Sequence, residues 1–174
     1  PDRVHVPVDR LLSPQRIRDV QADFDPERTR EPAHYGLPVD VGEDAGTQHI
    51  SVIDADGMAV ALTTTINTSF ASRVVAPQSG ILLNNEMDDF TTIQGEANLY
   101  GLRQSDWNLP LPGKRPLSSM SPTILLDEDG SIEAIAGASG GPRIISATLQ
   151  VLLGMSYGDL DAATAIDRSR VHHQ

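Results

Sequence analysis

The sequence predicts an α+β layered domain whose strands precede its helices. Two segments alternate polar and apolar residues on either side of an Asp-Gly turn, which is typical of β-hairpins. A later segment repeats apolar residues at helical spacing, and no regular alternation of strand and helix runs along the chain. The 174 residues are enough for one domain with its own core, so we expect one fold.

Residues 1–46 are polar and rich in proline and charge. One helix is expected there, with Ser13 as its N-cap and Pro14 at the first helical position. Residues 25–46 show no hydrophobic period, which indicates an exposed linker leading to Thr47. The chain does not begin with Met and its first residues lack the layout of a secretory signal, so we expect a piece cut from a longer polypeptide and leave its compartment open.

The first hairpin is expected to begin at Thr47. Residues 49–53 alternate polar and apolar side chains, Asp56-Gly57 supplies a tight turn, and residues 58–66 resume a β-rich run. A second hairpin should pair residues 123–126 with 132–136 across another Asp-Gly turn. Ile81-Leu82-Leu83 is a candidate for a short buried strand, so we expect the middle of the chain to be mainly sheet.

Two helices are expected after the second hairpin. Pro142 follows Gly140-Gly141 and opens a segment with apolar residues at helical spacing, namely Ile144, Ile145, Thr148, Leu149, Leu152 and Met155. Residues 160–168 predict another helix. Strands followed by helices complete the α+β pattern.

Composition excludes several classes of function. With 13 Lys and Arg against 24 Asp and Glu, the net charge of −11 argues against nucleic acid and anionic lipid. The absence of cysteine excludes disulfides, thiolate metal sites and a cysteine nucleophile. No stretch approaches the roughly 20 apolar residues of a membrane span, and the five histidines lack a metal-ligand spacing, so neither metal nor cofactor is expected.

Thr47 is a candidate nucleophile because chain cleavage before it would supply its own base. A threonine hydroxyl needs a base within hydrogen-bond reach, and an α-amine, with a pKa of roughly 7.7–8, is substantially neutral near neutral pH. Gly46 removes side-chain bulk at the Gly46–Thr47 bond and permits unusual backbone angles. The alternative is that Thr47 is only a β-former at a strand start, and its immediate neighbourhood by itself favours that alternative.

The run 84–90 places amides and carboxylates directly after the candidate strand. Strand alternation would put Glu86 and Asp88, or Asn85 and Asp89, on common faces. Such acids can hold an ammonium group. A solvated strand end is the alternative.

Two further segments carry groups suited to binding anions. Ser118 and Ser119 lie between prolines and could orient a carboxylate, although an ordinary Ser/Pro loop is equally consistent. The small residues of 137–143 precede a helix, where backbone N–H groups can approach an oxyanion. A glycine-rich turn without a ligand is the alternative, and a phosphate site is not expected because the nucleotide-binding motifs are absent.

Taken in order along the chain, these motifs resemble those of γ-glutamyltransferases, also called glutathione hydrolases. The resemblance covers residues 47–174, most of the family's small catalytic subunit, with truncation at the C-terminus; residues 1–46 look like the end of the large subunit with its processing linker. It is carried by Thr47-Gln48-His49, Thr65-Ile66-Asn67, the Asn84 to Phe90 run, Lys114-Arg115-Pro116-Leu117-Ser118-Ser119-Met120, Ser139-Gly140-Gly141 and Arg170-Val171-His172-His173-Gln174.

The resemblance implies a fold and a catalytic centre. The fold would be part of the αββα four-layer sandwich of Ntn hydrolases. Thr47 would cut the chain after Gly46 and then accept the acyl group, with Thr65 assisting it by hydrogen bonding. Gly140 and Gly141 would supply the oxyanion-binding N–H groups.

The same resemblance implies how the substrate is held. Asn67, Glu86 and Asp89 would bind the α-amino end of a γ-glutamyl group, and Ser118 and Ser119 its α-carboxylate. Tyr100 falls where some members carry a lid aromatic, although a half-buried loop tyrosine explains it equally well. The family's carboxylate-binding arginine lies in the absent part of the large subunit, so Arg73, Arg103 and Arg143 are not assigned that role.

The expected function is γ-glutamyl transfer or hydrolysis, with glutathione as donor and water, an amino acid or a peptide as acceptor. The resemblance also implies the remaining large-subunit polypeptide as partner, a periplasmic or secreted location, and no cofactor. One alternative is an amidase resembling cephalosporin acylase. Another is a non-catalytic precursor fragment or interaction module, since Gly46 and Thr47 are continuous here and an uncleaved fragment should be inactive.

Overall fold

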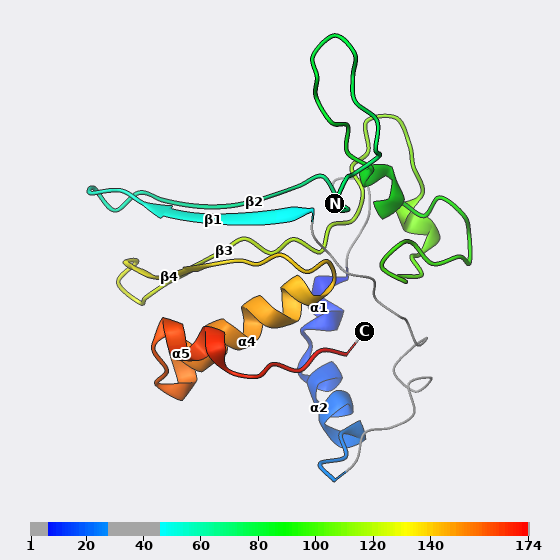
Figure 1. The fold of residues 1–174 in the computed structure, drawn as a ribbon. Helices are drawn as coiled ribbons and strands as arrows, with labels where there is room; N and C mark the ends of the chain where they lie inside the picture. The colour runs from blue at the N-terminus through cyan, green and yellow to red at the C-terminus, as the bar shows by residue number, and fades with distance from the viewer. Residues whose placement is uncertain (1–6, 28–45, 174) are drawn as a thin grey trace.

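A computed structural model describes residues 7–27 and 46–173, and two hairpins and two helices form its layers (Figure 1). Short helices α1 (Val8–Leu11) and α2 (Pro14–Asp23) come first. The main elements are β1 (Thr47–Ile53), β2 (Ala59–Thr65), β3 (Thr123–Leu126), β4 (Ile132–Ala136), α4 (Arg143–Gly158) and α5 (Ala162–Asp167), with 3₁₀ turns η1 (Glu86–Asp89) and η2 (Asp106–Asn108) between β2 and β3.

Both expected hairpins are confirmed. β1 pairs antiparallel with β2 in a register that sets Thr47 opposite Thr65 and Ile53 opposite Ala59. The Asp54 carboxylate accepts hydrogen bonds from the N–H groups of Asp56 and Met58, at 2.9 and 2.8 Å, which fixes the tight turn. β3 pairs antiparallel with β4, with an irregularity at Leu125/Leu126.

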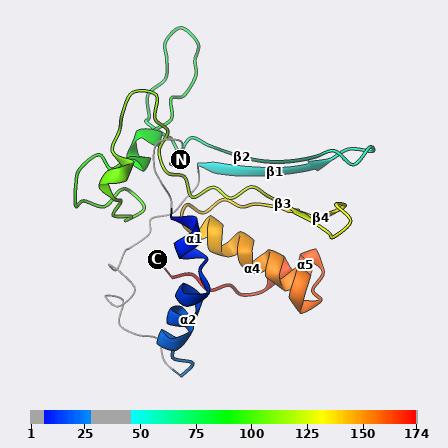
Figure 2. The same ribbon diagram turned by 180° about the vertical axis from the view of Figure 1, so that it is seen from behind.

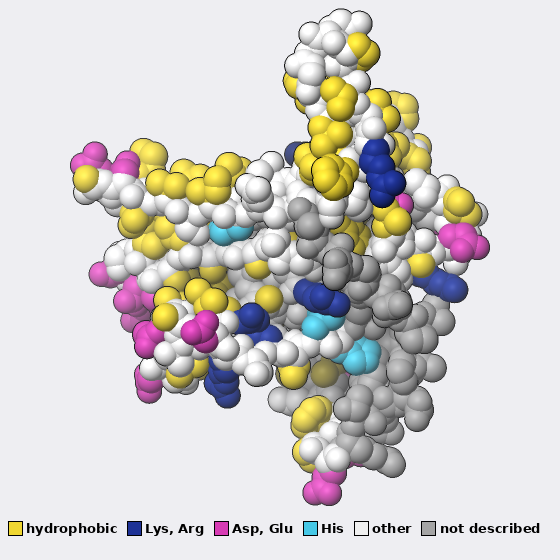
Figure 3. Space-filling model, viewed as in Figure 1, with side chains coloured by type: hydrophobic (Ala, Val, Ile, Leu, Met, Phe, Trp, Pro, Cys, Tyr) yellow, Lys and Arg dark blue, Asp and Glu magenta, His cyan; other side chains and the backbone are white. Residues whose placement is uncertain are grey.

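The two hairpins stack on each other, and α4 and α5 lie on the β3–β4 side (Figures 1 and 2). The Ser51 hydroxyl of β1 donates to the Ile135 carbonyl of β4 at 3.4 Å, so alternation turns Thr47, His49 and Ser51 toward the second hairpin. The outer face carries four apolar side chains that are 49–51% exposed, Ile50, Val52, Val60 and Leu62. Figure 3 shows hydrophobic side chains along this hairpin.

The expected C-terminal helices are also present. α4 begins after Gly140-Gly141-Pro142, and its Ile144 is only 1% exposed. It ends at Asp159, which adopts the left-handed conformation with φ 49°. α5 is capped by Asp161, whose carboxylate accepts from the Thr164 N–H at 2.9 Å.

The N-terminal helix begins as expected. The Ser13 hydroxyl accepts from the Arg16 N–H at 3.1 Å and Pro14 is the first residue of α2. None of the side chains of α2 is buried. Most of the expected linker lies outside the described residues, so the division of the chain at residue 46 stays a prediction.

The region between β2 and β3, residues 66–122, is not mainly sheet, which corrects our expectation. It is built of loops and the turns η1 and η2 (green in Figure 1). The buried strand expected at 81–83 is wrong: Leu82 forms only an isolated bridge with Val75, and Ile81 is 61% exposed. Three apolar residues without a neighbouring ladder or a covering layer do not make a buried strand.

The acidic run also differs from the expected strand end. Glu86–Asp89 forms a 3₁₀ turn, in which residues three apart share a face. Glu86 and Asp89 are therefore the pair that lies together, rather than the pairs that strand alternation suggested.

Candidate active site

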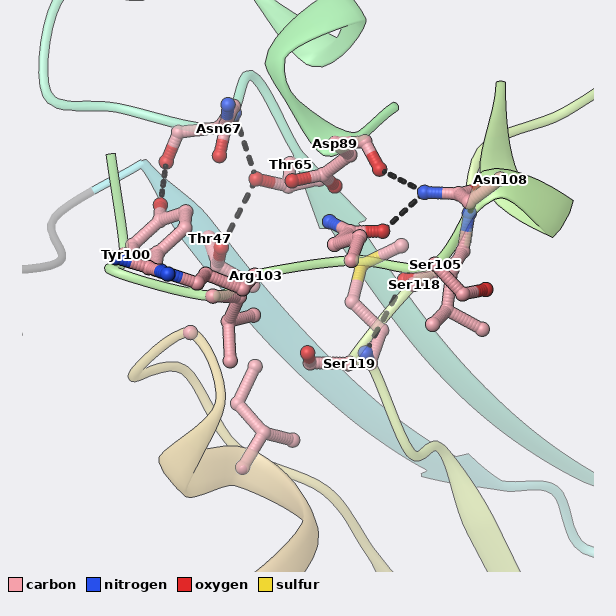
Figure 4. A pocket seen from close by; sticks show the side chains of 16 residues that line it. Thr47, Thr65, Asn67, Asp89, Tyr100, Arg103, Ser105, Asn108, Ser118 and Ser119 are labelled. Carbon is pink, nitrogen blue, oxygen red and sulfur yellow. Dashed lines mark hydrogen bonds between the residues drawn. The ribbon is translucent and has the colours of Figure 1, made fainter. Parts of the chain in front are cut away.

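A cavity of about 260 Å³ lies where the open end of the β1–β2 hairpin meets the 66–122 loops and the start of α4 (Figure 4). Its wall combines hydroxyl, amide, carboxylate and apolar side chains. The lining residues are Thr47, Thr65, Asn67, Asp89, Tyr100, Leu102, Arg103, Gln104, Ser105, Asn108, Leu117, Ser118, Ser119, Met120, Gly141 and Ile144.

Two threonine hydroxyls lie in contact at the base of the cavity. The register of the first hairpin sets Thr47 beside Thr65, and their Oγ1 atoms are 2.9 Å apart. Thr65 Oγ1 accepts from the Asn67 N–H at 2.8 Å and donates to the Gly46 carbonyl at 3.2 Å. Because its single proton goes to that carbonyl, Thr47 is the donor in the contact between the two hydroxyls.

Asn67 and Tyr100 close one side of the site. Asn67 is 3% exposed and has φ 74°, an uncommon conformation for which asparagine is better suited than most residues. The Tyr100 hydroxyl donates to the Asn67 carbonyl at 2.8 Å, and the Asn67 amide donates to the Asn85 carbonyl at 3.2 Å. These bonds fix the chain directly after Thr65.

Two glycines are required here by close approach. A Cβ on Gly46 would lie 2.4 Å from the Asn67 carbonyl oxygen. A Cβ on Gly141, which has φ 55°, would lie 2.9 Å from the Tyr100 ring. Gly141 lines the cavity at the start of α4, whereas its neighbour Gly140 is not part of the cavity wall.

Glu86 and Asp89 form an acidic pair in η1. Burial, followed by the charge of Asp89, raises the pKa of Glu86 to about 7. Burial also raises the pKa of Asp89. Glu86 Oε1 is buried without a hydrogen-bond partner, and of the two only Asp89 lines the cavity. A partly buried acid pair of this kind suits a cationic ligand, which would favour both charged forms.

Ser118 and Ser119 also line the cavity (Figure 4). The Ser118 hydroxyl accepts from the Met120 N–H at 3.1 Å, which leaves its proton available to an acceptor. The residues proposed for catalysis and binding therefore line one cavity, with two exceptions. Glu86 lies in the same turn as Asp89 and Gly140 precedes Gly141, but neither lines the cavity itself.

Sequence analysis did not identify Arg103 or Asn108 as parts of this site. Arg103 lines the cavity from an exposed position three residues after Tyr100. Asn108 lies in the short turn η2 and is 7% exposed. Neither residue belongs to a hydrophobic period or a recognisable sequence motif. The only signal in the sequence is that Arg103 lies three residues after Tyr100.

Over the ranges 7–27 and 46–173, no helix is long and apolar enough to cross a membrane. The same ranges contain no group of three or more His, Asp or Glu side chains that could hold a metal ion.

The family model for gamma-glutamyltranspeptidase matches residues 1–174. The glutathione hydrolase proenzymes of Escherichia coli K12 and Pseudomonas sp. A14 are 43% and 41% identical over 100% of this chain, which spans 30% of the length of each. The solved gamma-glutamyltranspeptidase of Pseudomonas nitroreducens, complexed with L-DON, is 46% identical, with a TM-score of 0.69 over 72% of this chain and 65% of that one.

Proposed function

This chain belongs to the gamma-glutamyltranspeptidase family, and from that premise we propose that it carries the nucleophile of an enzyme that cleaves and transfers γ-glutamyl groups. The donor class is γ-glutamyl amides such as glutathione, and the acceptor is water or an amine. Since the chain spans 30% of the length of the Escherichia coli and Pseudomonas sp. A14 proenzymes, the proposed working enzyme includes further polypeptide that corresponds to the rest of them. The complete αββα sandwich belongs to that whole assembly.

The first reaction is a cut between Gly46 and Thr47. Thr47 Oγ1 attacks the Gly46 carbonyl carbon and gives its proton to Thr65 Oγ1, while Thr65 passes its own proton to the Gly46 carbonyl oxygen. As the tetrahedral intermediate collapses, the C–N bond breaks, the Thr47 nitrogen takes the proton from that oxygen, and an ester joins Gly46 to Thr47 Oγ1. Water then hydrolyses the ester, which leaves a carboxylate on Gly46 and a free amine and hydroxyl on Thr47.

The second reaction uses the same hydroxyl on substrate. The new α-amine of Thr47 serves as base, Oγ1 attacks the γ-carbonyl carbon, and the amide nitrogen leaves with a proton. N–H groups at Gly140 and Gly141 receive the oxyanion. Water or an acceptor amine then displaces Thr47 Oγ1 and completes hydrolysis or transfer.

The acidic and hydroxyl groups that line the cavity suit the zwitterionic end of a γ-glutamyl group. Asp89, with Glu86 behind it and Asn67 nearby, attracts the α-ammonium. Ser118 and Ser119 donate to the α-carboxylate. Tyr100 covers the cavity beside Gly141 as a lid.

One observation carries the proposal: the Thr47 hydroxyl touches Thr65 at 2.9 Å while Thr65 touches the Gly46 carbonyl at 3.2 Å. The polypeptide that contains this chain should resolve by intact mass into two fragments divided before Thr47. Thr47→Ala should give one uncut mass and no turnover. A single stable mass from the unaltered protein, or a Thr47→Ala variant that still cuts, would overturn the proposal.

The closest rival is an amidase resembling cephalosporin acylase, which would share Thr47 but accept a different acyl group. The presence of Asp89 and Ser118-Ser119 in one cavity lining favours a γ-glutamyl substrate. Rates on a γ-glutamyl anilide and on a glutaryl anilide, which lacks the α-amine but keeps the carboxylate, decide between them. Faster cleavage of the glutaryl compound would assign the rival activity.

A non-catalytic role is the candidate from another class. It is favoured by the exposed apolar face of the first hairpin, which partner polypeptide could cover. An uncut chain that binds its partner stably without turnover would support that role and exclude the enzyme.

A further inference from the structure

We infer that Asn108 is a positioning residue that holds the two substrate-binding walls of the cavity at a fixed separation. It contacts no expected reacting atom, so its role is separate from the ligand roles given above. The inference rests on the proposed γ-glutamyl specificity, which the two walls would serve.

The Asn108 side chain bonds to both walls at once. Its amide nitrogen donates to the Asp89 carbonyl at 2.6 Å, and its amide oxygen accepts from the Leu117 N–H at 3.0 Å (Figure 4 labels Asn108 beside Asp89 and Ser118). Asp89 carries the carboxylate of the acidic wall, and Leu117 directly precedes Ser118. One amide thus links the ammonium-binding and carboxylate-binding segments.

The rest of Asn108 is held equally firmly. The amide nitrogen also donates to Gln104 Oε1, and the main-chain carbonyl accepts from the Thr91 N–H at 3.1 Å. Its N–H donates to the Ser105 carbonyl at 2.9 Å. With a 7% exposed side chain, Asn108 has little water to replace a lost bond, so its removal leaves partners unsatisfied.

No other residue type supplies this link at the same length. Aspartate keeps the acceptor for Leu117 but loses the donor to Asp89 and adds a charge, whereas alanine loses both bonds. A longer or branched side chain would overfill a buried position. Asn108→Asp therefore releases the Asp89 segment, and Asn108→Ala releases both the Asp89 and the Leu117 segments.

The test uses the full-length protein and three substrates, a γ-glutamyl anilide, a glutaryl anilide and a 4-aminobutyryl anilide. Asn108→Asp should raise KM for the γ-glutamyl compound roughly tenfold with little change in kcat, and should reduce the preference over the glutaryl compound by a similar factor. Asn108→Ala should also reduce the preference over the 4-aminobutyryl compound, which keeps the amine and lacks the carboxylate.

Two measurements separate positioning from general support of the fold. Cleavage at Gly46–Thr47 should be complete in both variants, because it needs Thr47 and Thr65 rather than the walls. Gln78→Glu makes an amide-to-acid change on an exposed loop and should leave all three preferences unaltered. If Asn108 variants keep the substrate preferences of the unaltered protein, or lose them only together with chain cleavage, the inference is overturned; an unaltered protein without γ-glutamyl preference would instead overturn the proposed function.

Discussion

The paired strands and the 66–122 loops contribute different things to one cavity. The first hairpin sets Thr47 against Thr65 by strand register, a geometry that many main-chain hydrogen bonds maintain. The loops place Asn67, Asp89 and Ser118 through single side-chain bonds between segments far apart in sequence. The difference suggests that damage to the hairpin end removes the chemistry, whereas damage to the loops changes which substrate is held.

The largest effect is expected at Thr65. Thr65→Val keeps the shape but removes the hydroxyl that touches Thr47 Oγ1 and the Gly46 carbonyl. The rate of chain cleavage, followed by gel or intact mass, should fall about 100- to 1,000-fold, as when one oxyanion donor is lost. Thr65→Ser should keep most of the rate; equal rates in the Val and Ser variants would remove Thr65 from the chemistry.

Gly46→Ala should impair the cut and nothing after it. A Cβ there would lie 2.4 Å from the Asn67 carbonyl oxygen, and a clash costing about 1–3 kcal/mol slows cleavage roughly tenfold or more. Once cut, Thr47 has the same structure as in the unaltered protein, so kcat of the cleaved form should be unchanged. Gly158→Ala, where the nearest atom is 3.8 Å away, is the matched control; a lowered kcat in cleaved Gly46→Ala would contradict this account.

A pH dependence should arise from the loop region. Glu86 has a pKa of about 7, so it is ionised above that pH and neutral below it. KM for a γ-glutamyl anilide should therefore rise as pH falls, roughly tenfold for each unit below the pKa, because the ammonium loses a partner. Ionisation of the Thr47 α-amine, which is the proposed base, should instead change kcat with pH. Glu86→Gln should have a raised KM that no longer changes with pH between about 6 and 8; an unchanged pH profile would exclude Glu86 from ammonium binding.

The smallest effect is expected at Tyr100. Tyr100→Phe removes the hydroxyl that donates to the Asn67 carbonyl but keeps the ring against Gly141. A single lost hydrogen bond is worth about 1 kcal/mol, so KM should rise about fivefold without loss of chain cleavage. Tyr100→Ala, which also removes the ring, should have the larger KM; identical values would assign the whole effect to the hydroxyl.

The framework could be predicted from the sequence because its signals are local. Alternation around Asp56-Gly57 predicted β1 and β2, helical spacing after Pro142 predicted α4, and Ser13-Pro14 predicted the start of α2. Each of these patterns lies within one element and needs no knowledge of what packs on it.

The loops could not be predicted in this way because distant partners fix them. Tyr100 binds a carbonyl 33 residues away, and Asn108 binds Asp89 and Leu117 on different segments. The 3₁₀ turn that brings Glu86 and Asp89 together contradicts the strand alternation expected there. The family resemblance proposed ligands in these loops, but it did not point to Asn108, which bonds to both the Asp89 and the Leu117 segments.

The contact of Thr65 with both Thr47 and Gly46 has a consequence for how faulty molecules would be recognised. On the proposed chemistry, a polypeptide cuts itself only when the Thr47 and Thr65 hydroxyls are correctly placed, so cleavage reports on that pair. Cleavage does not depend on the substrate-binding walls that Asn108 holds. Selection for cleaved molecules would therefore preserve the catalytic hydroxyls but would not by itself preserve substrate specificity.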